Sequence, residues 1–190
     1  MKCATERKPV YMIRFYILIL SVMPLTSTYP KQPYTLIKTF ETIELRWYPS
    51  VMKIQSKGEF SPLFNYISGK NETGQKIEMT TPVHQSVATQ DPFMEFVLPE
   101  RYTKNNTPKA STAEVKIVES TPGYYVAIGF SGYATATKKK YFTEVLKLEA
   151  QQLGFEIIGT PILLVYNSPY RIFNRKNELV VEINELTIPK

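Results

Sequence analysis

The one histidine of the chain, His84, decides which kinds of chemistry the sequence supports. A nucleophilic triad needs a base beside a Ser or Cys nucleophile, and a zinc site needs three or four His, Cys or carboxylate ligands. Only one cysteine is present, Cys3, no carboxylate pair stands at metal-ligand spacing, and no glycine-rich phosphate loop occurs. We therefore predict no catalytic residues and no metal site, and we expect His84 at a surface or edge position at the end of a strand.

A short apolar helix offers a different chemistry, the binding of a flat apolar ligand. The spacing i, i+3, i+4, i+7 predicts one helix face, formed by Phe60, Leu63, Phe64 and Ile67. Ser61 is the expected cap, Pro62 fits the first turn because its missing N–H needs no partner there, and Gly69 is expected to end the helix. The same stripe would pack on a sheet in a protein of any function, so the pattern alone leaves both interpretations open.

The elements that must position this helix repeat one pattern twice. Each half is predicted as a strand, a helix and two further strands, with a loop rich in Pro, Lys and Asn (99–111) between the halves. Apolar periodicity predicts strands at 35–40, 43–48, 51–55, 76–87, 93–98, 115–119, 124–130, 162–166 and 178–183, and a second helix at 137–153 that ends at Gly154. We expect the arms 115–119 and 124–130 to form a hairpin over residues 121–123. A duplicated β-α-β-β unit predicts one α+β domain rather than two.

Six motifs in this order and spacing resemble the SOUL (haem-binding protein) family. The first joins the short helix, a GKN loop and the strand 79–83. The others are the hairpin 34–38 with 43–49, then 115–119, 130–134, 166–169 and 174–178. Together they cover about Tyr34 to Ile183. The resemblance implies a distorted antiparallel β-barrel, built from the duplicated unit, with two helices packed on it.

The family resemblance also implies a ligand and a site. SOUL proteins are implied to bind haem or a related tetrapyrrole in a pocket between the first helix and the loop before the last strand. Carried over by position, the contacting residues are Lys57, Phe60, Leu63, Phe64 and Ile67 of the helix, and Tyr170, Arg171 and Phe173 of the loop. The resemblance thus favours a shallow apolar pocket with a cationic rim and no catalysis.

The polar contacts of such a ligand are less clear from the sequence. Lys57, Arg171 or Arg175 would pair with the propionates of haem through charge-assisted hydrogen bonds. Met79, Tyr66 and Tyr170 carry atoms that can ligate iron, but none of them stands out as an axial ligand. We therefore expect haem as a ligand whose iron lacks a strong protein donor.

Two other functions stay open at this point. A protein of the same fold could serve as an interaction scaffold that binds no haem. It would act through exposed loops or through the Lys138–Lys140 face, which we expect to be solvated, with a membrane-surface role as the minor alternative. A small-molecule hydrolase, similar to bacterial effector-binding domains, would need Glu44 or Glu78 inside the barrel beside an aromatic ring, with a raised pKa. Because Glu78 alternates with Met79, it points outward if Met79 points to the core.

Residues 1–28 are predicted to be a secretory signal peptide. A basic flank precedes the apolar run Phe15–Leu25, and Thr26–Thr28 supply small residues for cleavage after Thr28. The run is short for a membrane span, which needs about 20 apolar residues, and a retained signal anchor is the alternative. Removing this segment, with its four Lys or Arg and one Glu, lowers the formal charge from +6 to +3. No basic stripe interleaved with aromatics suggests nucleic-acid binding.

The mature chain, residues 29–190, is expected to be a secreted monomer or weak dimer. It contains no cysteine and hence no disulfide, which a domain of this length does not need. The sequons at Asn71 and Asn105 lie in predicted loops and fit a secretory route as glycosylation sites. Pro108, directly after the second sequon, is expected to reduce its use.

Overall fold

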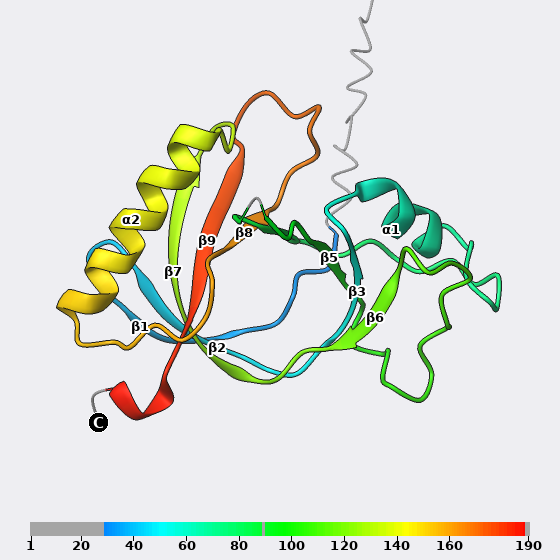
Figure 1. Ribbon diagram of the computed structural model, residues 1–190, viewed down its shortest axis with the longest axis horizontal. Helices are drawn as coiled ribbons and strands as arrows, with labels where there is room; N and C mark the ends of the chain where they lie inside the picture. The colour runs from blue at the N-terminus through cyan, green and yellow to red at the C-terminus, as the bar shows by residue number, and fades with distance from the viewer. Residues whose placement is uncertain (1–28, 89, 189–190) are drawn as a thin grey trace, which may run out of the picture.

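The structure, a computed structural model, describes residues 29–88 and 90–188, and the predicted signal peptide lies outside them. Within these residues the chain forms one nine-stranded antiparallel sheet with two α-helices and a short 3-10 helix (Figure 1). The strands are β1 (Thr35–Thr39), β2 (Glu44–Tyr48), β3 (Met52–Ser56), β4 (Val83–Ser86), β5 (Met94–Val97), β6 (Lys116–Glu119), β7 (Gly123–Ser131), β8 (Ile162–Val165) and β9 (Lys176–Ile183). The helices are α1 (Phe60–Ile67), α2 (Ala136–Gln152) and η1 (Glu185–Thr187). No helix in the described ranges is long and apolar enough to cross a bilayer.

The predicted duplication is confirmed by the strand order, β1-β2-β7-β9-β8-β4-β5-β3-β6. One unit, β3-α1-β4-β5, pairs its strands as β4-β5-β3, and the other, β7-α2-β8-β9, pairs its strands in the equivalent order β8-β9-β7. The two units join where β4 pairs with β8. In this strand order the sheet has β1 and β6 at its ends and is not closed, so the predicted barrel is not confirmed, whereas the α+β class and the single domain are confirmed.

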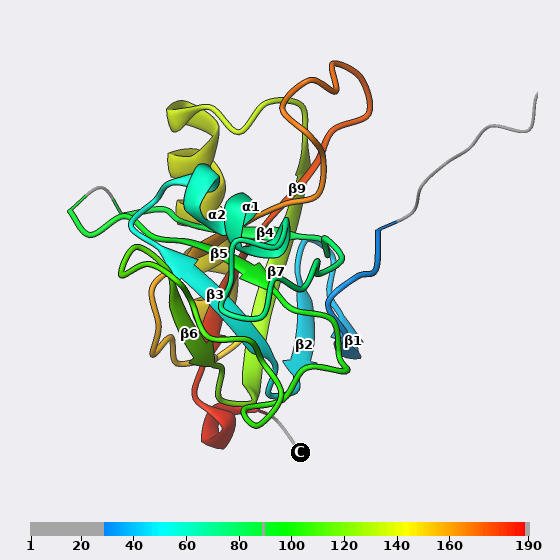
Figure 2. The same cartoon turned by 90° about the vertical axis from the view of Figure 1, so that its right-hand side faces the viewer.

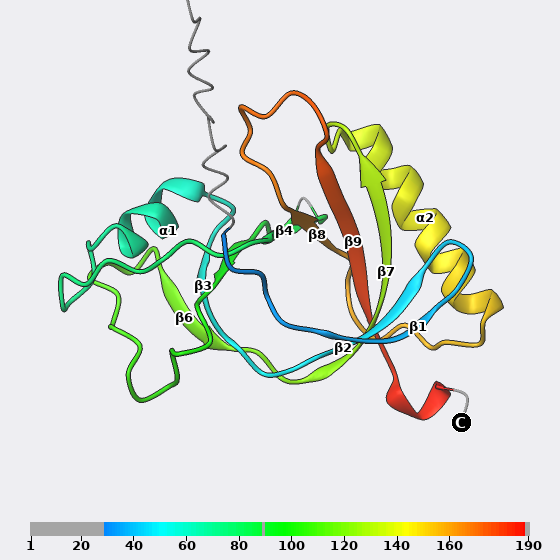
Figure 3. The same cartoon turned by 180° about the vertical axis from the view of Figure 1, so that it is seen from behind.

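A continuous pair of strands connects the two halves. Trp47 of β2 lies opposite Tyr124 of β7. Met52 of β3, five residues after Trp47, lies opposite Glu119 of β6, five residues before Tyr124, so the antiparallel register is unchanged from one pair of strands to the other. Figure 3 shows both segments curving beneath the two halves. The predicted β6–β7 hairpin is therefore wrong. Pro122 cannot donate a ladder hydrogen bond, and its neighbourhood forms a corner within one long strand instead of a turn that reverses it.

The two helices cover the outer flanks of the curved sheet. Figure 2, which looks from the α1 side, shows α1 in front and α2 behind. Leu146 and Ala150 of α2 are fully buried against alternate residues of β2, β7 and β9. Leu63 and Tyr66 of α1 are buried against β3 and β5. The opposite face of these strands is turned away from both helices, and we call it the concave face.

Local sequence explains most of the helix ends. Gly69 and Gly154 have positive φ values of 107° and 81° just after the two helices, as predicted. Thr135 caps α2 by accepting a hydrogen bond from the backbone N–H of Lys138. The predicted Ser61 cap of α1 is wrong, because the residue before the helix is Glu59, whose side chain makes no capping bond.

A segment at the start of the described chain, residues 29–33, shortens strand β4. The strand was predicted from residue 76 but begins only at Val83. Just before it, Thr81 donates its backbone N–H to the Pro30 carbonyl and accepts one from the N–H of Gln32, both at 2.8 Å. We call residues 29–33 the N-terminal strap. It occupies the backbone groups that the predicted longer strand would have used.

Candidate functional site

The concave face carries a row of buried polar side chains. Gln55 of β3, Glu95 of β5 and His84 of β4 lie directly opposite one another on neighbouring strands. Lys53 donates from Nζ to Glu95 Oε2 at 3.1 Å and lies 3.4 Å from His84 Nδ1, while Gln55 donates to Glu95 Oε1 at 2.9 Å. The charges of Lys53 and Glu95 are thereby paired inside the fold.

His84 belongs to this row, and the expectation of a surface or edge position is wrong. Its side chain is buried, and Nε2 lies 2.7 Å from Oε1 of Gln32, which the N-terminal strap delivers. Burial lowers the pKa of His84 to about 4, and the neighbouring Lys53 charge acts in the same direction against the attraction of Glu95. His84 is therefore a neutral part of the fold at physiological pH.

A second buried network lies on the other half of the concave face. The guanidinium of Arg46 donates to both carboxylate oxygens of Glu178, at 2.8 and 3.1 Å, and also to Glu44 at 2.7 Å. The Tyr166 hydroxyl donates to Glu178 at 2.6 Å, and Lys176 pairs with the same carboxylate. Burial alone would raise the pKa of Glu178, but hydrogen bonds from Arg46, Tyr166 and Lys176 hold it at about 2.

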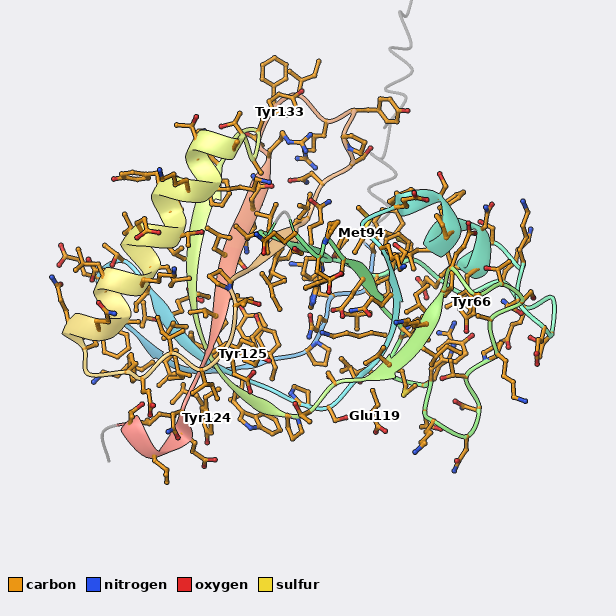
Figure 4. The ribbon with its side chains drawn as sticks, in the orientation of Figure 1. Tyr66, Met94, Glu119, Tyr124, Tyr125 and Tyr133 are labelled. Atoms are coloured by element: carbon orange, nitrogen blue, oxygen red, sulfur yellow. The ribbon has the colours of Figure 1, made fainter. Side chains whose placement is uncertain are left out.

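Between these networks lies a cavity of about 30 Å³. Tyr125 lines it, whereas its neighbour Tyr124 packs on the opposite face against the α2 core (Figure 4). Other lining residues are Gln32, Tyr48, Lys53, His84 and Leu164. A volume of this size holds a water molecule or two, whereas ligand pockets usually measure about 300–1,000 Å³. This cavity is consequently too small for a tetrapyrrole in this conformation.

The concave carboxylates do not supply the chemistry that the hydrolase alternative requires. Burial would raise the pKa of Glu95, but the His84 and Lys53 contacts outweigh it and lower the pKa to about 2, as for Glu178. Glu44 does point inward, but Arg46 binds it. Glu78 is about half exposed while Met79 packs on the core, as the alternation predicted. Neither Glu95 nor Glu178 is thus a carboxyl group of raised pKa.

Helix α1 divides the predicted apolar stripe into two parts. Leu63 and Ile67 are buried in the core, at 0% and 5% exposure. Phe60 and Phe64 are half exposed, and their rings stack with centroids 5.7 Å apart. We call this pair the α1 shelf. Phe96 supports it from below, because its ring meets Phe60 edge-on at 5.2 Å.

The rest of the predicted helix site is the cation Lys57, which is exposed just before α1. It precedes Phe60, the first residue of the helix, by three positions. The α1 shelf and Lys57 therefore form the accessible portion of the helix side of the predicted site.

The predicted loop residues lie in the β8–β9 loop, residues 166–175. Tyr170, Arg171 and Phe173 are all exposed, with Tyr170 at 91% and Phe173 at 78%. Arg175 is different, because it is buried and its guanidinium donates to the carbonyls of Ser168, Pro169 and Arg171. Arg175 is therefore committed to the loop itself and is not free for a propionate.

The structure places the two parts of the predicted pocket at one end of the molecule but over different halves. In Figures 1 and 3 both lie at the top, α1 over the β3–β5 half and the β8–β9 loop beside the end of β9. Among the described residues no hydrogen bond, ion pair or ring contact joins α1 to this loop. The helix and the loop are thus two separate surfaces in this conformation.

The residues with atoms that can ligate iron do not surround the α1 shelf. Tyr66 is buried and donates its hydroxyl to the Pro108 carbonyl, and burial raises its pKa to about 12. Met79 packs against the core around α1, and Tyr170 lies in the separate loop. Within the described ranges no group of three or more His, Cys, Asp or Glu could hold a metal ion. The exposed rings of Phe60 and Phe64 could cover the face of a tetrapyrrole and Lys57 could pair with its acid groups. None of the three residues carries an atom that commonly ligates iron.

The two sequons differ sharply. Asn71 is buried, and its amide donates to the carbonyls of Tyr66 and Gln75 while its oxygen accepts from Thr73 and Gln75. Both amide hydrogens are used, so a glycan at Asn71 would displace bonds that fix the GKN loop, and the structure argues against this predicted site. Asn105 is exposed in the loop after β5 and stays a predicted site.

The sequence of the chain is similar to that of a known protein family. The sequence profile of the "SOUL heme-binding protein" family matches residues 29–182. The chain belongs to this family. Human heme-binding protein 2 is a relative with 28% identity over 139 residues, and the match covers 67% of this chain and 66% of that protein, just under two thirds of its length.

Two solved structures share the fold at low sequence identity. The C-terminal domain of EcmrR has a TM-score of 0.54 at 10% identity, covering 80% of this chain and 98% of that one. A hydrolase from Listeria innocua has a TM-score of 0.51 at 14% identity, covering 78% of this chain and 94% of that one. These likenesses concern the fold alone.

Sequence reasoning missed the buried networks around Arg46 and Lys53. Each of these cations alternates with apolar residues in its strand, Leu45 for Arg46 and Ile54 for Lys53, and such alternation usually places the polar side in solvent. The available signal was the presence of complementary charges at the polar positions of strands in both halves, namely Lys53 with Glu95 and Arg46 with Glu178.

Proposed function

We propose that this SOUL protein binds haem or a related tetrapyrrole, without catalysis, with one face of the macrocycle lying on the α1 shelf. The observation that carries the proposal is the stacked and half-exposed pair Phe60 and Phe64 on a helix whose other apolar residues are buried. Membership of the family supports a tetrapyrrole as the flat ligand. Leu63 and Ile67 hold the shelf from the core side.

Polar contacts complete the proposed site. Lys57, which is exposed just before α1, would pair with a propionate through a charge-assisted contact. Tyr170, Arg171 and Phe173 form the second element of the site predicted from the sequence, and the loop would have to approach α1 to take part. The helix is therefore expected to contribute more to affinity than the loop does.

The size of the shelf sets the expected affinity. Burying about 300 Å² of apolar ligand surface at ~25 cal/mol per Å² gives several kcal/mol before the cost of association. This corresponds to a Kd in the micromolar range or weaker. Without an iron ligand beside the shelf, haemin and protoporphyrin are expected to bind with similar affinity.

Titration of the chain with haemin, followed by Soret absorbance, tests the proposal. The double variant Phe60→Ala/Phe64→Ala should weaken binding at least about tenfold, with unchanged far-UV circular dichroism. Tyr141→Ala is the matched control, because Tyr141 is a similarly exposed aromatic on α2. Saturable binding that is equal in the wild type and the double variant would overturn the α1 site. Absence of saturable binding in the wild type would leave the interaction scaffold as the function.

The proposed setting is extracellular. The basic flank and apolar run of residues 1–28 support secretion with cleavage after Thr28, and the exposed Asn105 is compatible with glycosylation. Protein sequencing of the secreted chain tests this, since a retained anchor would leave residues 1–28 attached.

A further inference from the structure

The tip of the β8–β9 loop exposes more apolar surface than folding explains. Tyr170, Ile172 and Phe173 are 91%, 66% and 78% exposed, within four consecutive residues. Single exposed apolar residues are ordinary, but three large ones at the apex of one projecting loop are not. Figures 1 and 2 show this loop extending beyond the ends of β8 and β9.

Hydrogen bonds within the β8–β9 loop fix its conformation. The buried guanidinium of Arg175 donates to the Ser168 and Arg171 carbonyls at 3.0 and 2.7 Å and to that of Pro169 at 3.2 Å. At the base, Asn167 Oδ1 accepts the backbone N–H of Lys176 at 2.6 Å. A guanidinium placed at the centre of the loop leaves no room there for the apolar side chains. The internal structure of the loop therefore holds its apolar residues in solvent.

A second segment stands beside the loop and adds one more exposed aromatic residue. The turn after β7 is joined to it because Gly132 donates its N–H to the Arg175 carbonyl and accepts from Asn177. Tyr133 in this turn is half exposed, and the Arg175 guanidinium lies 4.5 Å from its ring centroid (Figure 4). The turn leads directly into the basic start of α2.

The charge around the tip has one sign. Segments 131–140 and 166–175 together contain five Lys or Arg and no Asp or Glu. Lys138, Lys140 and Arg171 are exposed, and none of them forms a salt bridge with another described residue. An apolar tip backed by unpaired cations thus faces outward.

We propose that this end of the molecule docks on the surface of an anionic lipid bilayer, with Tyr170, Ile172 and Phe173 entering the headgroup region. Aromatic and aliphatic side chains partition into that region, and each nearby Lys or Arg adds attraction to acidic headgroups. The charge complementarity favours lipid over a second copy of this chain, because the same cations would repel each other across a symmetric contact. The narrow apex also suits insertion better than a protein interface, which usually buries about 800 Å² per partner.

Co-sedimentation with vesicles tests the proposal on the chain from Tyr29 onward, which contains every described element and lacks the apolar run 15–25. Vesicles of phosphatidylcholine with phosphatidylserine should bind at least about tenfold more protein than vesicles of phosphatidylcholine alone, and salt should weaken binding. The triple variant Tyr170→Ser/Ile172→Ser/Phe173→Ser should lose binding at least about tenfold. The variant Lys138→Gln/Lys140→Gln should weaken binding several-fold.

The matched control is Leu186→Ser, because Leu186 is also 91% exposed but lies in η1 at the opposite end of the molecule (Figure 1). Equal losses in the control and the triple variant would overturn the proposal, as would a wild-type chain that ignores phosphatidylserine. Self-association that the triple variant abolishes, without vesicle binding, would make the tip a protein contact and overturn it too. Tyr170 and Phe173 belong to both proposals, whereas α1, which is expected to contribute most of the tetrapyrrole affinity, is intact in every variant. Haemin titration of the triple variant therefore separates failure of the membrane proposal from failure of the tetrapyrrole site.

Discussion

The concave face and the upper end of the molecule hold their unusual side chains in opposite ways. On the concave face, charged groups are buried and paired, as in Arg46 with Glu178 and Lys53 with Glu95. At the upper end, large apolar side chains are half exposed on α1 and mostly exposed on the β8–β9 loop. The paired charges are accounted for by the fold, whereas the exposed rings are not. We therefore expect the buried charges to contribute to stability and the exposed apolar side chains to contribute to binding.

Breaking a concave pair should have the largest effect on stability. Glu178→Ala leaves the buried Arg46 guanidinium with Glu44 as its remaining carboxylate, and loss of one member of a buried pair costs about 3–5 kcal/mol. The free energy of unfolding, from chemical denaturation, measures this loss. Glu78→Ala is the control, because its contact with Arg101 is 3.9 Å long and exposed, and it should change stability by less than about 0.5 kcal/mol. Similar values for both variants would show that the concave charges are not structural.

The buried and the half-exposed residues of the α1 stripe should also differ in their contribution to stability. Leu63→Ala removes a fully buried side chain and should cost about 2–5 kcal/mol in unfolding free energy. Phe64→Ala removes a half-exposed ring and should cost less than about 1 kcal/mol, although it removes more atoms. Denaturation curves of both variants make the comparison. A larger loss for Phe64→Ala would mean that the α1 shelf belongs to the core.

Acid should destabilise the folded protein through protonation of His84. The folded pKa is about 4 against an ordinary 6.5, so the unfolded chain binds a proton that the folded chain refuses within this window. The free energy of unfolding should therefore fall as pH drops from 6.5 to 4, by up to about 3 kcal/mol. Glu95 and Glu178 add their own loss only below about pH 4.5, as they are protonated toward pH 2. In His84→Gln the slope between pH 6.5 and 4 should flatten, and an unchanged slope would assign it to another group.

The loop tip should contribute least to stability. Replacing Tyr170, Ile172 and Phe173 by Ser removes apolar groups that are already in water, and the free energy of unfolding should change by less than about 0.5 kcal/mol. The thermal midpoint checks this, with Leu186→Ser as the reference. A loss above about 2 kcal/mol would show that the tip packs on the protein in solution, which would remove the contrast between the two regions.

Local rules were sufficient to predict the elements of this fold. The 3.6-residue period placed both helices, glycine placed their ends, and alternation placed all nine strands within a few residues except for the start of β4. The prediction failed where it depended on which strands pair with each other. Thr121, Pro122 and Gly123 carry an ordinary turn signal, yet the partner strands β2 and β3 run on without a break. Only the long-range register distinguishes a corner from a hairpin.

The candidate site was partly predictable for a related reason. Sequence identified the apolar stripe of α1 but not which rings it would leave in solvent, because that depends on how much of an eight-residue helix the sheet covers. His84 was predicted at a surface or edge position because it follows Val83 at the end of a strand, but it points to the face of β4 opposite the apolar one. The sheet curves so strongly that this face meets the other half of the sheet instead.

The N-terminal strap makes the position of processing matter. A cut after Thr28 leaves Gln32 in place over His84, with Lys31 bridged to Thr81. A protease that trimmed only a few residues further would expose the imidazole and open the 30 Å³ cavity to solvent at that side. The position of the cut would then set how acid-resistant the protein is, with no change to any residue of the sheet.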